Sequence, residues 1–235
     1  MSEKMPGTLH IAEGGFRPRQ ELLEAYGKRH QEFMPRAIEQ AGFRETYGGP
    51  IPESPWWLFF AKFDTLETME NWQHERMHVQ IQDEARNKWW SAYYLRKGRL
   101  VGDGEAISGK ILHETMLLRN SQLSQKENGL VTAALSDVES LKIVPYEAVK
   151  GVHLATPYVF AQLAGAFPER APVQYVLLTC WATTRDCAQW QESPAHRTVC
   201  QFGDTTSTSY CMIPERKPRM GLADDRMHRQ WVAPE

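Results

Sequence analysis

The stretch "ENWQHERMH" at residues 70–78 determines how the whole chain is interpreted. Its pattern returns in the second half of the chain as "AQWQESPAH" at residues 188–196. Each copy contains a tryptophan followed six positions later by a histidine: Trp72 and His78, then Trp190 and His196. Both residue types recur at one offset of 118 positions, so the chain contains the same short pattern twice.

The residues before each copy show that a larger segment is repeated. The apolar stretch "WLFFAKF" at 57–63 aligns with "YVLLTCW" at 175–181 at the same offset, and both are typical of buried strands. In the first half, periodicity and turn residues predict strands at 8–16, 43–49, 55–63 and 109–119, and helices at 17–42, 64–75 and 78–95. The order β-α-β-β-α-β is that of the ferredoxin-like motif.

We therefore predict an α+β fold made of two ferredoxin-like units. The first spans residues 1–119, the second and more divergent one spans 130–213, and a polar tail follows at 214–235. Between the units, residues 120–129 are predicted to be a linker. A sheet with helices on only one face leaves its other face bare. Two such sheets can cover each other, so we expect an intramolecular α+β barrel.

The second copy also predicts how the histidines are placed. Ser193 and Pro194 are an N-cap and a first helical residue, so one helix should end near Glu192 and another should begin there. His196 then lies in the first turn of the new helix. If the first copy breaks in the same way, His78 points toward the sheet. Because a helix N-terminus disfavours the imidazolium, we expect a neutral ring that can accept a proton.

The stretch "FDTLETMENWQHERMH" at 63–78 resembles the antibiotic-biosynthesis-monooxygenase group of dimeric α+β barrels. The strand "ILHETMLLR" at 111–119 is similar to the closing strand of the related NIPSNAP-type group. The resemblance covers residues 8–119 and 172–213, and it implies a tandem dimeric α+β barrel with a ligand cleft between helices and sheet. Many members of this superfamily oxidise phenolic or anthrone-like substrates with O2 and without a metal.

Two positions of the repeated pattern correspond to functional positions in those oxygenases. The helix tryptophan lines the cleft, which by resemblance assigns Trp72 and Trp190 to substrate binding. The position six residues later is tyrosine in anthrone oxygenases, whereas this chain has His78 and His196.

Other positions depart from the family pattern. The asparagine that anthrone oxygenases place one turn before the tryptophan is Thr68 in the first copy and Asp186 in the second. Haem-degrading relatives ligate haem through a histidine ten residues after the tryptophan, and this chain has Gln82 and Cys200 there. The resemblance therefore implies no tightly bound haem, and no metal-ligand spacing is present in the sequence.

These residues predict a small-molecule oxygenase that acts on an aromatic or enolisable, polyketide-like substrate, with O2 as co-substrate. His78 would be the base and Arg86 the partner of a developing phenolate, between walls formed by Trp72 and Trp89. Further candidates for substrate binding are His10, His113, Trp190 and His196. An isomerase or cyclase using the same pocket is an alternative, as is a non-catalytic ligand-binding or assembly module. The histidines could also be core residues that hydrogen-bond to the backbone.

Composition limits the partners of this chain. A net charge of −2 gives no basic face for nucleic acid, and no apolar run approaches the roughly 20 residues of a membrane span. The four cysteines form no CxxC pair, which indicates a cytoplasmic protein with reduced thiols. The residues leave open whether a diffusible reduced flavin takes part and whether the chain forms a homodimer.

Overall fold

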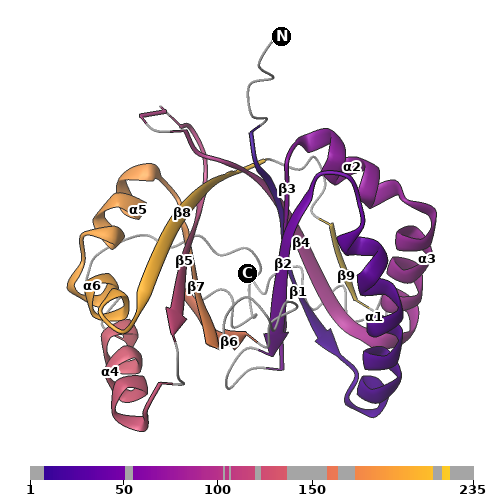
Figure 1. Cartoon of the computed structure of the whole chain (residues 1–235), viewed down its shortest axis with the longest axis horizontal. Helices are drawn as coiled ribbons and strands as arrows, with labels where there is room; N and C mark the ends of the chain where they lie inside the picture. The colour runs from indigo at the N-terminus through magenta and orange to yellow at the C-terminus, as the bar shows by residue number, and fades with distance from the viewer. Residues whose placement is uncertain are drawn as a thin grey trace, which may run out of the picture. The chain divides into compact units, whose positions relative to one another are not determined.

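The computed structural model describes residues 8–50, 55–102, 104–105, 107–119, 123–136, 158–163, 173–213 and 219–222. These residues form two compact units (Figure 1). The first unit comprises the described parts of residues 1–100 and 213–235, and the second comprises those of residues 101–212.

The first unit is an antiparallel sheet with its helices on one face (Figure 1). Its strands lie in the order β2-β3-β1-β4, and β9 pairs with residues 92–95 of β4. In chain order the elements are β1 (His10–Pro18), a 3-10 turn (Gln20–Leu22), α1 (Leu23–Ile38), β2 (Phe43–Pro50), β3 (Trp57–Phe63), α2 (Leu66–His74), α3 (Arg76–Glu84), a π-helical turn (Ala85–Trp89), β4 (Trp90–Leu100) and β9 (Arg219–Leu222).

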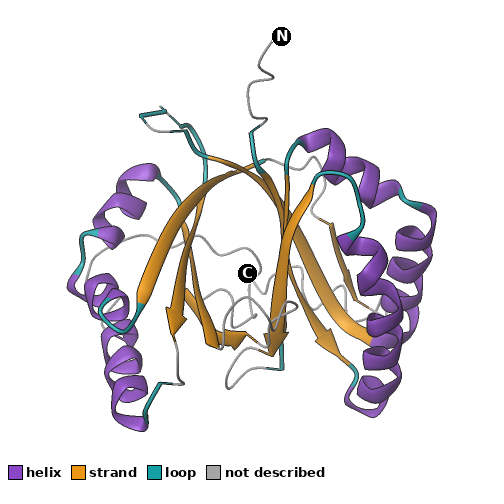
Figure 2. Ribbon diagram, in the orientation of Figure 1, coloured by secondary structure: helices purple, strands orange, loops and turns teal. Residues whose placement is uncertain are grey.

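The second unit has the same kind of architecture (Figure 2). Its strands lie in the antiparallel order β8-β5-β7-β6, so its first strand again lies between the third and the fourth. The elements are β5 (Ile111–Arg119), α4 (Gln125–Ser136), β6 (Tyr158–Leu163), β7 (Val173–Trp181), α5 (Thr184–Gln191), α6 (Pro194–Cys200) and β8 (Asp204–Met212). The predicted α+β class is confirmed.

The strand that completes the first sheet differs from the predicted one. The helix expected over 78–95 ends at Trp89, and β4 begins at Trp90. The stretch "WSAYYLRKGRL" is rich in aromatic residues, which favour strands, and it pairs with β1 along its length. Residues 111–119 were predicted to close the first unit, but β5 pairs with β7 and β8 instead.

Four further predictions concern the second half of the chain. The predicted linker at 120–129 overlaps α4, which starts at Gln125, and the helix expected at 153–165 overlaps β6. The strand expected at 141–151 lies outside the described residues. In the predicted polar tail, residues 219–222 form β9, which pairs with β4.

Local capping breaks both copies of the repeated pattern at the same place. Ser193 caps α6 by accepting a hydrogen bond from the backbone N–H of His196, and Pro194 is the first helical residue, as predicted. In the first copy the carboxylate of Glu75 accepts from the N–H of His78 at 2.7 Å and begins α3. Each histidine is therefore the third residue of its helix.

Candidate functional site

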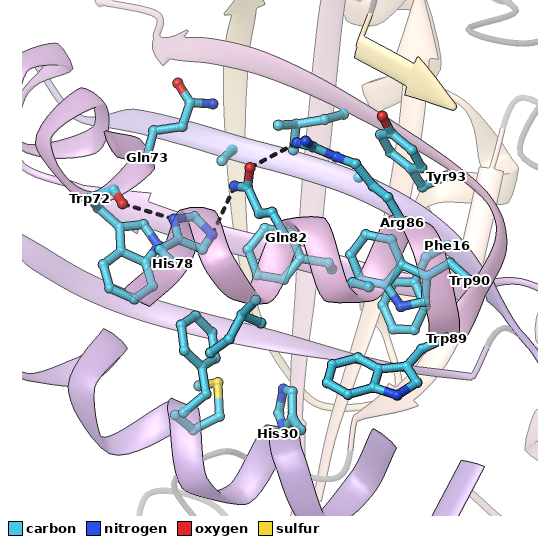
Figure 3. Close-up of a pocket in the computed structure, with 18 of the residues that line it drawn as sticks. Phe16, His30, Trp72, Gln73, His78, Gln82, Arg86, Trp89, Trp90 and Tyr93 are labelled. Carbon is cyan, nitrogen blue, oxygen red and sulfur yellow. Dashed lines mark hydrogen bonds between the residues drawn. The ribbon is translucent and has the colours of Figure 1, made fainter. Parts of the chain in front are cut away.

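A cavity lies in the first unit, between the sheet and the helices α1, α2 and α3 (Figure 3). Its volume is about 150 Å³, a size that in an apolar protein interior accommodates a benzene-sized ligand. Nine of the residues that line it are aromatic: Phe16, Tyr26, Phe33, Phe59, Phe63, Trp72, Trp89, Trp90 and Tyr93. The cavity therefore suits a small, flat, largely apolar molecule.

The sheet side of the cavity is kept open by a residue without a side chain. Gly14 of β1 lies between Phe59 of β3 and Leu95 of β4, and all three line the cavity. Glycine inside a strand often marks a place where a ligand approaches the backbone closely. The neighbouring Ala12 is also small, so ligand atoms can reach the sheet here.

His78 is held in one orientation and one tautomer. Its Nδ1 lies 2.8 Å from the carbonyl oxygen of Trp72, and a carbonyl can only accept, so Nδ1 carries the hydrogen and Nε2 carries the lone pair. The ring stacks on the Trp72 indole, with centroids 4.3 Å apart and planes 11° apart. Burial lowers the pKa of His78 to about 4, which keeps the ring neutral near pH 7. The predicted neutral state is thus supported by the geometry.

A row of hydrogen-bonded polar side chains runs along α3 from His78 (Figure 3). The Gln82 amide donates from Nε2 to Nε2 of His78 at 3.0 Å, and its Oε1 accepts from Nη2 of Arg86 at 2.8 Å. Arg86 also donates to Asp83 and lies over the Tyr93 ring. Residues 78, 82 and 86 are four apart, so they share one face of the helical segment. We call His78, Gln82 and Arg86 the polar row.

A charge at the centre of the polar row is expected to change the protonation of His78. Gln82→Glu places a carboxylate beside Nε2 of His78, which favours the imidazolium and should raise the pKa of His78 by about 1 to 3. A histidine-selective NMR titration measures the change. Gln80→Glu is the matched control, because Gln80 is exposed and hydrogen-bonds to Glu84 rather than to His78. Equal pKa values in both variants would show that Gln82 does not contact His78.

Helix α1 provides a further part of the cavity wall. Tyr26, Arg29, His30, Phe33 and Met34 all line it. The Arg29 guanidinium donates two hydrogen bonds to the Glu84 carboxylate, at 3.2 and 3.3 Å, which link α1 to α3 beside the cavity. Burial raises the pKa of the Tyr26 hydroxyl, so this group stays protonated.

The structure brings together four of the predicted site residues. Trp72, His78, Arg86 and Trp89 all line the cavity. His10 does not, and its Nδ1 instead lies 2.6 Å from the carbonyl oxygen of Thr8.

Three predicted site residues lie in the core of the second unit. The rings of His113 and His196 are 5.7 Å apart, and the Thr115 hydroxyl lies 3.0 Å from Nε2 of His196 and 3.4 Å from Nε2 of His113. Trp190 is fully buried and contacts the ring of His196. Burial lowers the pKa of His113 to about 3. This arrangement is the one expected of buried core histidines that have hydrogen-bond partners.

Two cavity residues were missed from the sequence. Gln82 was considered only as a departure from a haem-ligand position, although its spacing of four from both His78 and Arg86 could have shown that it joins them. His30 lies on the inward side of α1, but a lone histidine on such a face gives no sign of function. Among the described residues, no cluster of three or more His, Cys, Asp or Glu side chains is placed to bind a metal.

Comparison with known proteins shows the fold and leaves the family open. No family model matches the chain, and the search of curated proteins found no similar sequence. An aldoxime dehydratase in complex with butyraldoxime is similar in structure, with a TM-score of 0.57, 7% identity and coverage of 88% of this chain and 79% of that one. A second aldoxime dehydratase has a TM-score of 0.51 at 8% identity, and the match covers 94% of this chain and 84% of that one.

The TM-scores above 0.5 show that the chain shares the α+β fold of these two structures. An anthrone oxidase-like protein also matches at 12% identity over 95% of this chain and 96% of that one, but its TM-score is only 0.31. At these identities the likeness concerns the fold alone. Within the described residues, no helix is long and apolar enough to cross a membrane.

Proposed function

We propose that the chain is a small-molecule oxygenase that acts on an aromatic or enolisable substrate in the cavity of the first unit. The observation that carries this proposal is a neutral, tautomer-fixed histidine in the wall of an aromatic cavity. An enolisable molecule has an acidic hydrogen that such a group can remove, and the aromatic wall suits the rest of the molecule.

The proposed fold is a tandem of two ferredoxin-like units. Each unit places its strands in the same order, and the helix break at Glu75 recurs at Ser193 with the same capping contact. These agreements support duplication of one unit. The intramolecular barrel expected from the sequence stays a prediction.

In the proposed reaction, the substrate C–H bond breaks and its proton moves to Nε2 of His78. The Gln82 amide occupies this lone pair in the resting site, so it must turn away when the substrate binds. The electron pair stays on the substrate as an enolate or phenolate, which the Arg86 guanidinium can stabilise. The anion then forms a C–O bond with O2, and the proton returns from His78 to give a hydroperoxide. This sequence conserves atoms and electrons.

The proposal includes no tightly bound metal or haem. At the position where haem-degrading relatives have a histidine, the Gln82 amide is hydrogen-bonded at both ends and offers no ligand for haem iron. O2 is the co-substrate, and a diffusible reduced flavin is a further reagent to include in assays.

Two measurements with one substrate separate the proposed chemistry from its alternatives. With 2-tetralone, a small enolisable aromatic ketone, we expect exchange of the α-hydrogens with solvent deuterium and consumption of O2. Exchange without O2 consumption, also in the presence of reduced flavin, would favour an isomerase or cyclase. Binding without either reaction would favour a non-catalytic module. An assay without protein gives the background rate of both processes.

A further inference from the structure

His30 differs from the hydrogen-bonded polar residues of the cavity wall. His78, Gln82 and Arg86 hydrogen-bond to one another, and Arg29 is paired with Glu84. His30 lines the same cavity (Figure 3). Among the described residues, its only ring contact is with Tyr26, at 5.9 Å between centroids, and it makes no hydrogen bond. His30 therefore has hydrogen-bonding capacity that the protein does not use.

The position of His30 explains how this capacity is satisfied when the cavity is empty. His30 is exposed to solvent, so water can reach the ring. The surrounding protein nevertheless lowers the pKa of His30 below its usual value, and a neutral imidazole has one N–H and one lone pair. A ligand that fills the cavity displaces water from the cavity side of the ring, and a ligand group that replaces the hydrogen bond lost there strengthens binding.

Three buried atoms of the cavity wall add to this requirement. Among the described residues, Oε1 of Gln73 and the indole Nε1 atoms of Trp89 and Trp90 have no hydrogen-bond partner. The first is an acceptor and the other two are donors, and all three side chains line the cavity. A ligand that both donates and accepts hydrogen bonds would therefore satisfy the groups left without partners. A hydroxyl group does both, whereas a hydrocarbon does neither and an ether only accepts.

We infer that the ligand of this cavity carries a hydroxyl group, as in a phenol, an enol or an oxime, and that it donates the hydroxyl hydrogen to His30. The inference rests on the proposed function only in using the same cavity, and it adds a substrate class to it. The polar row then faces the reacting carbon and its oxygen, while His30 selects molecules by a second polar group. His30 is in this sense a specificity-determining residue.

The test compares phenol with anisole, in which a methyl group replaces the hydroxyl hydrogen. Dissociation constants for both are measured by calorimetry, or by saturation-transfer NMR if binding is weak, on wild type and on His30→Phe. The phenylalanine ring keeps the shape of the wall and removes both nitrogens. We expect His30→Phe to weaken phenol binding about 5- to 10-fold, the usual worth of one hydrogen bond, and to leave anisole binding unchanged.

Two further variants test whether the loss of phenol binding is specific to His30. His74→Phe is the same substitution on α2 at an exposed residue that does not line the cavity, and it should change neither affinity. His78→Phe tests the other histidine of the cavity wall. If the preference for phenol disappears in His78→Phe and persists in His30→Phe, the assignment to His30 is overturned.

The remaining outcomes separate this inference from the proposed function. Unchanged anisole binding in His30→Phe shows that the variant is folded and its cavity intact. If His30→Phe weakens the binding of both compounds equally, or of neither, then His30 does not receive a hydroxyl hydrogen, although the cavity remains a ligand site. If wild type binds neither compound, the cavity is not a site for small aromatic ligands. That result would reject the inference and the proposed function together.

Discussion

Replacing His78 by alanine is expected to lower the rate of proton removal from the substrate by about 100-fold or more, the usual contribution of a positioned general base. His78 is neutral, and its Nδ1–H is fixed on the carbonyl of Trp72, which leaves Nε2 as the only position that can accept a proton. The change is measured as the rate of deuterium exchange at the α-carbon of 2-tetralone.

His196→Ala is the matched control, because His196 occupies the corresponding position in the second unit. Its Nδ1 lies 3.1 Å from the carbonyl of Gln191 and its Nε2 lies 3.0 Å from the Thr115 hydroxyl, so both ring nitrogens are used inside a core. We expect this variant to keep the exchange rate and to lose about 1–3 kcal/mol of stability. Loss of exchange in His196→Ala, with near-normal exchange in His78→Ala, would show that the reaction takes place in the second unit and would contradict the assignment to the first.

Replacing Trp190 by alanine is expected to lower the free energy of unfolding by about 3–5 kcal/mol. Trp190 is fully buried, with its ring 5.7 Å from that of Trp181, in a core that also contains Leu177 and Val199. Removing the indole leaves a large void among side chains that are fixed by β7 and α6. Equilibrium denaturation in urea, followed by far-UV circular dichroism, measures the loss.

Trp72→Ala is the matched variant in the first unit, at the same position of the repeated pattern. Trp72 borders a cavity that already exists, so its removal enlarges that cavity instead of opening a new one. We expect a smaller loss of stability than in Trp190→Ala and a clear loss of affinity for phenol and anisole. Equal destabilisation by the two substitutions would contradict the distinction between a cavity wall and a closed core.

Prediction succeeded where a few neighbouring residues determine the structure. Ser193 and Pro194 define a helix start, and the cap bonds to His196 only three residues away. The break in the first copy follows the same logic, although Glu75 is the capping residue there. Each of these features depends on contacts within one turn of helix.

Prediction failed where distant residues decide the structure. The aromatic stretch from Trp90 continues a helical spacing, but it pairs with β1 from Trp90 to Arg99, so it forms β4. The strand at 111–119 was assigned to the first unit because β4 had not been recognised, and only its pairing with β7 and β8 shows where it belongs. Strand pairing joins residues far apart in the chain, and local patterns do not encode it.

The sequence by itself determined that a strand and two short helices occur twice, that each copy orients a histidine toward the sheet, and that Trp72, His78, Arg86 and Trp89 are candidates for one site. Their convergence on one cavity was decided by the tertiary structure. So was the place of His30, which α1 brings to the same cavity from 48 positions before His78. Caps and helical spacing act over three or four residues and can be read directly, whereas a cavity forms only when separate elements pack together.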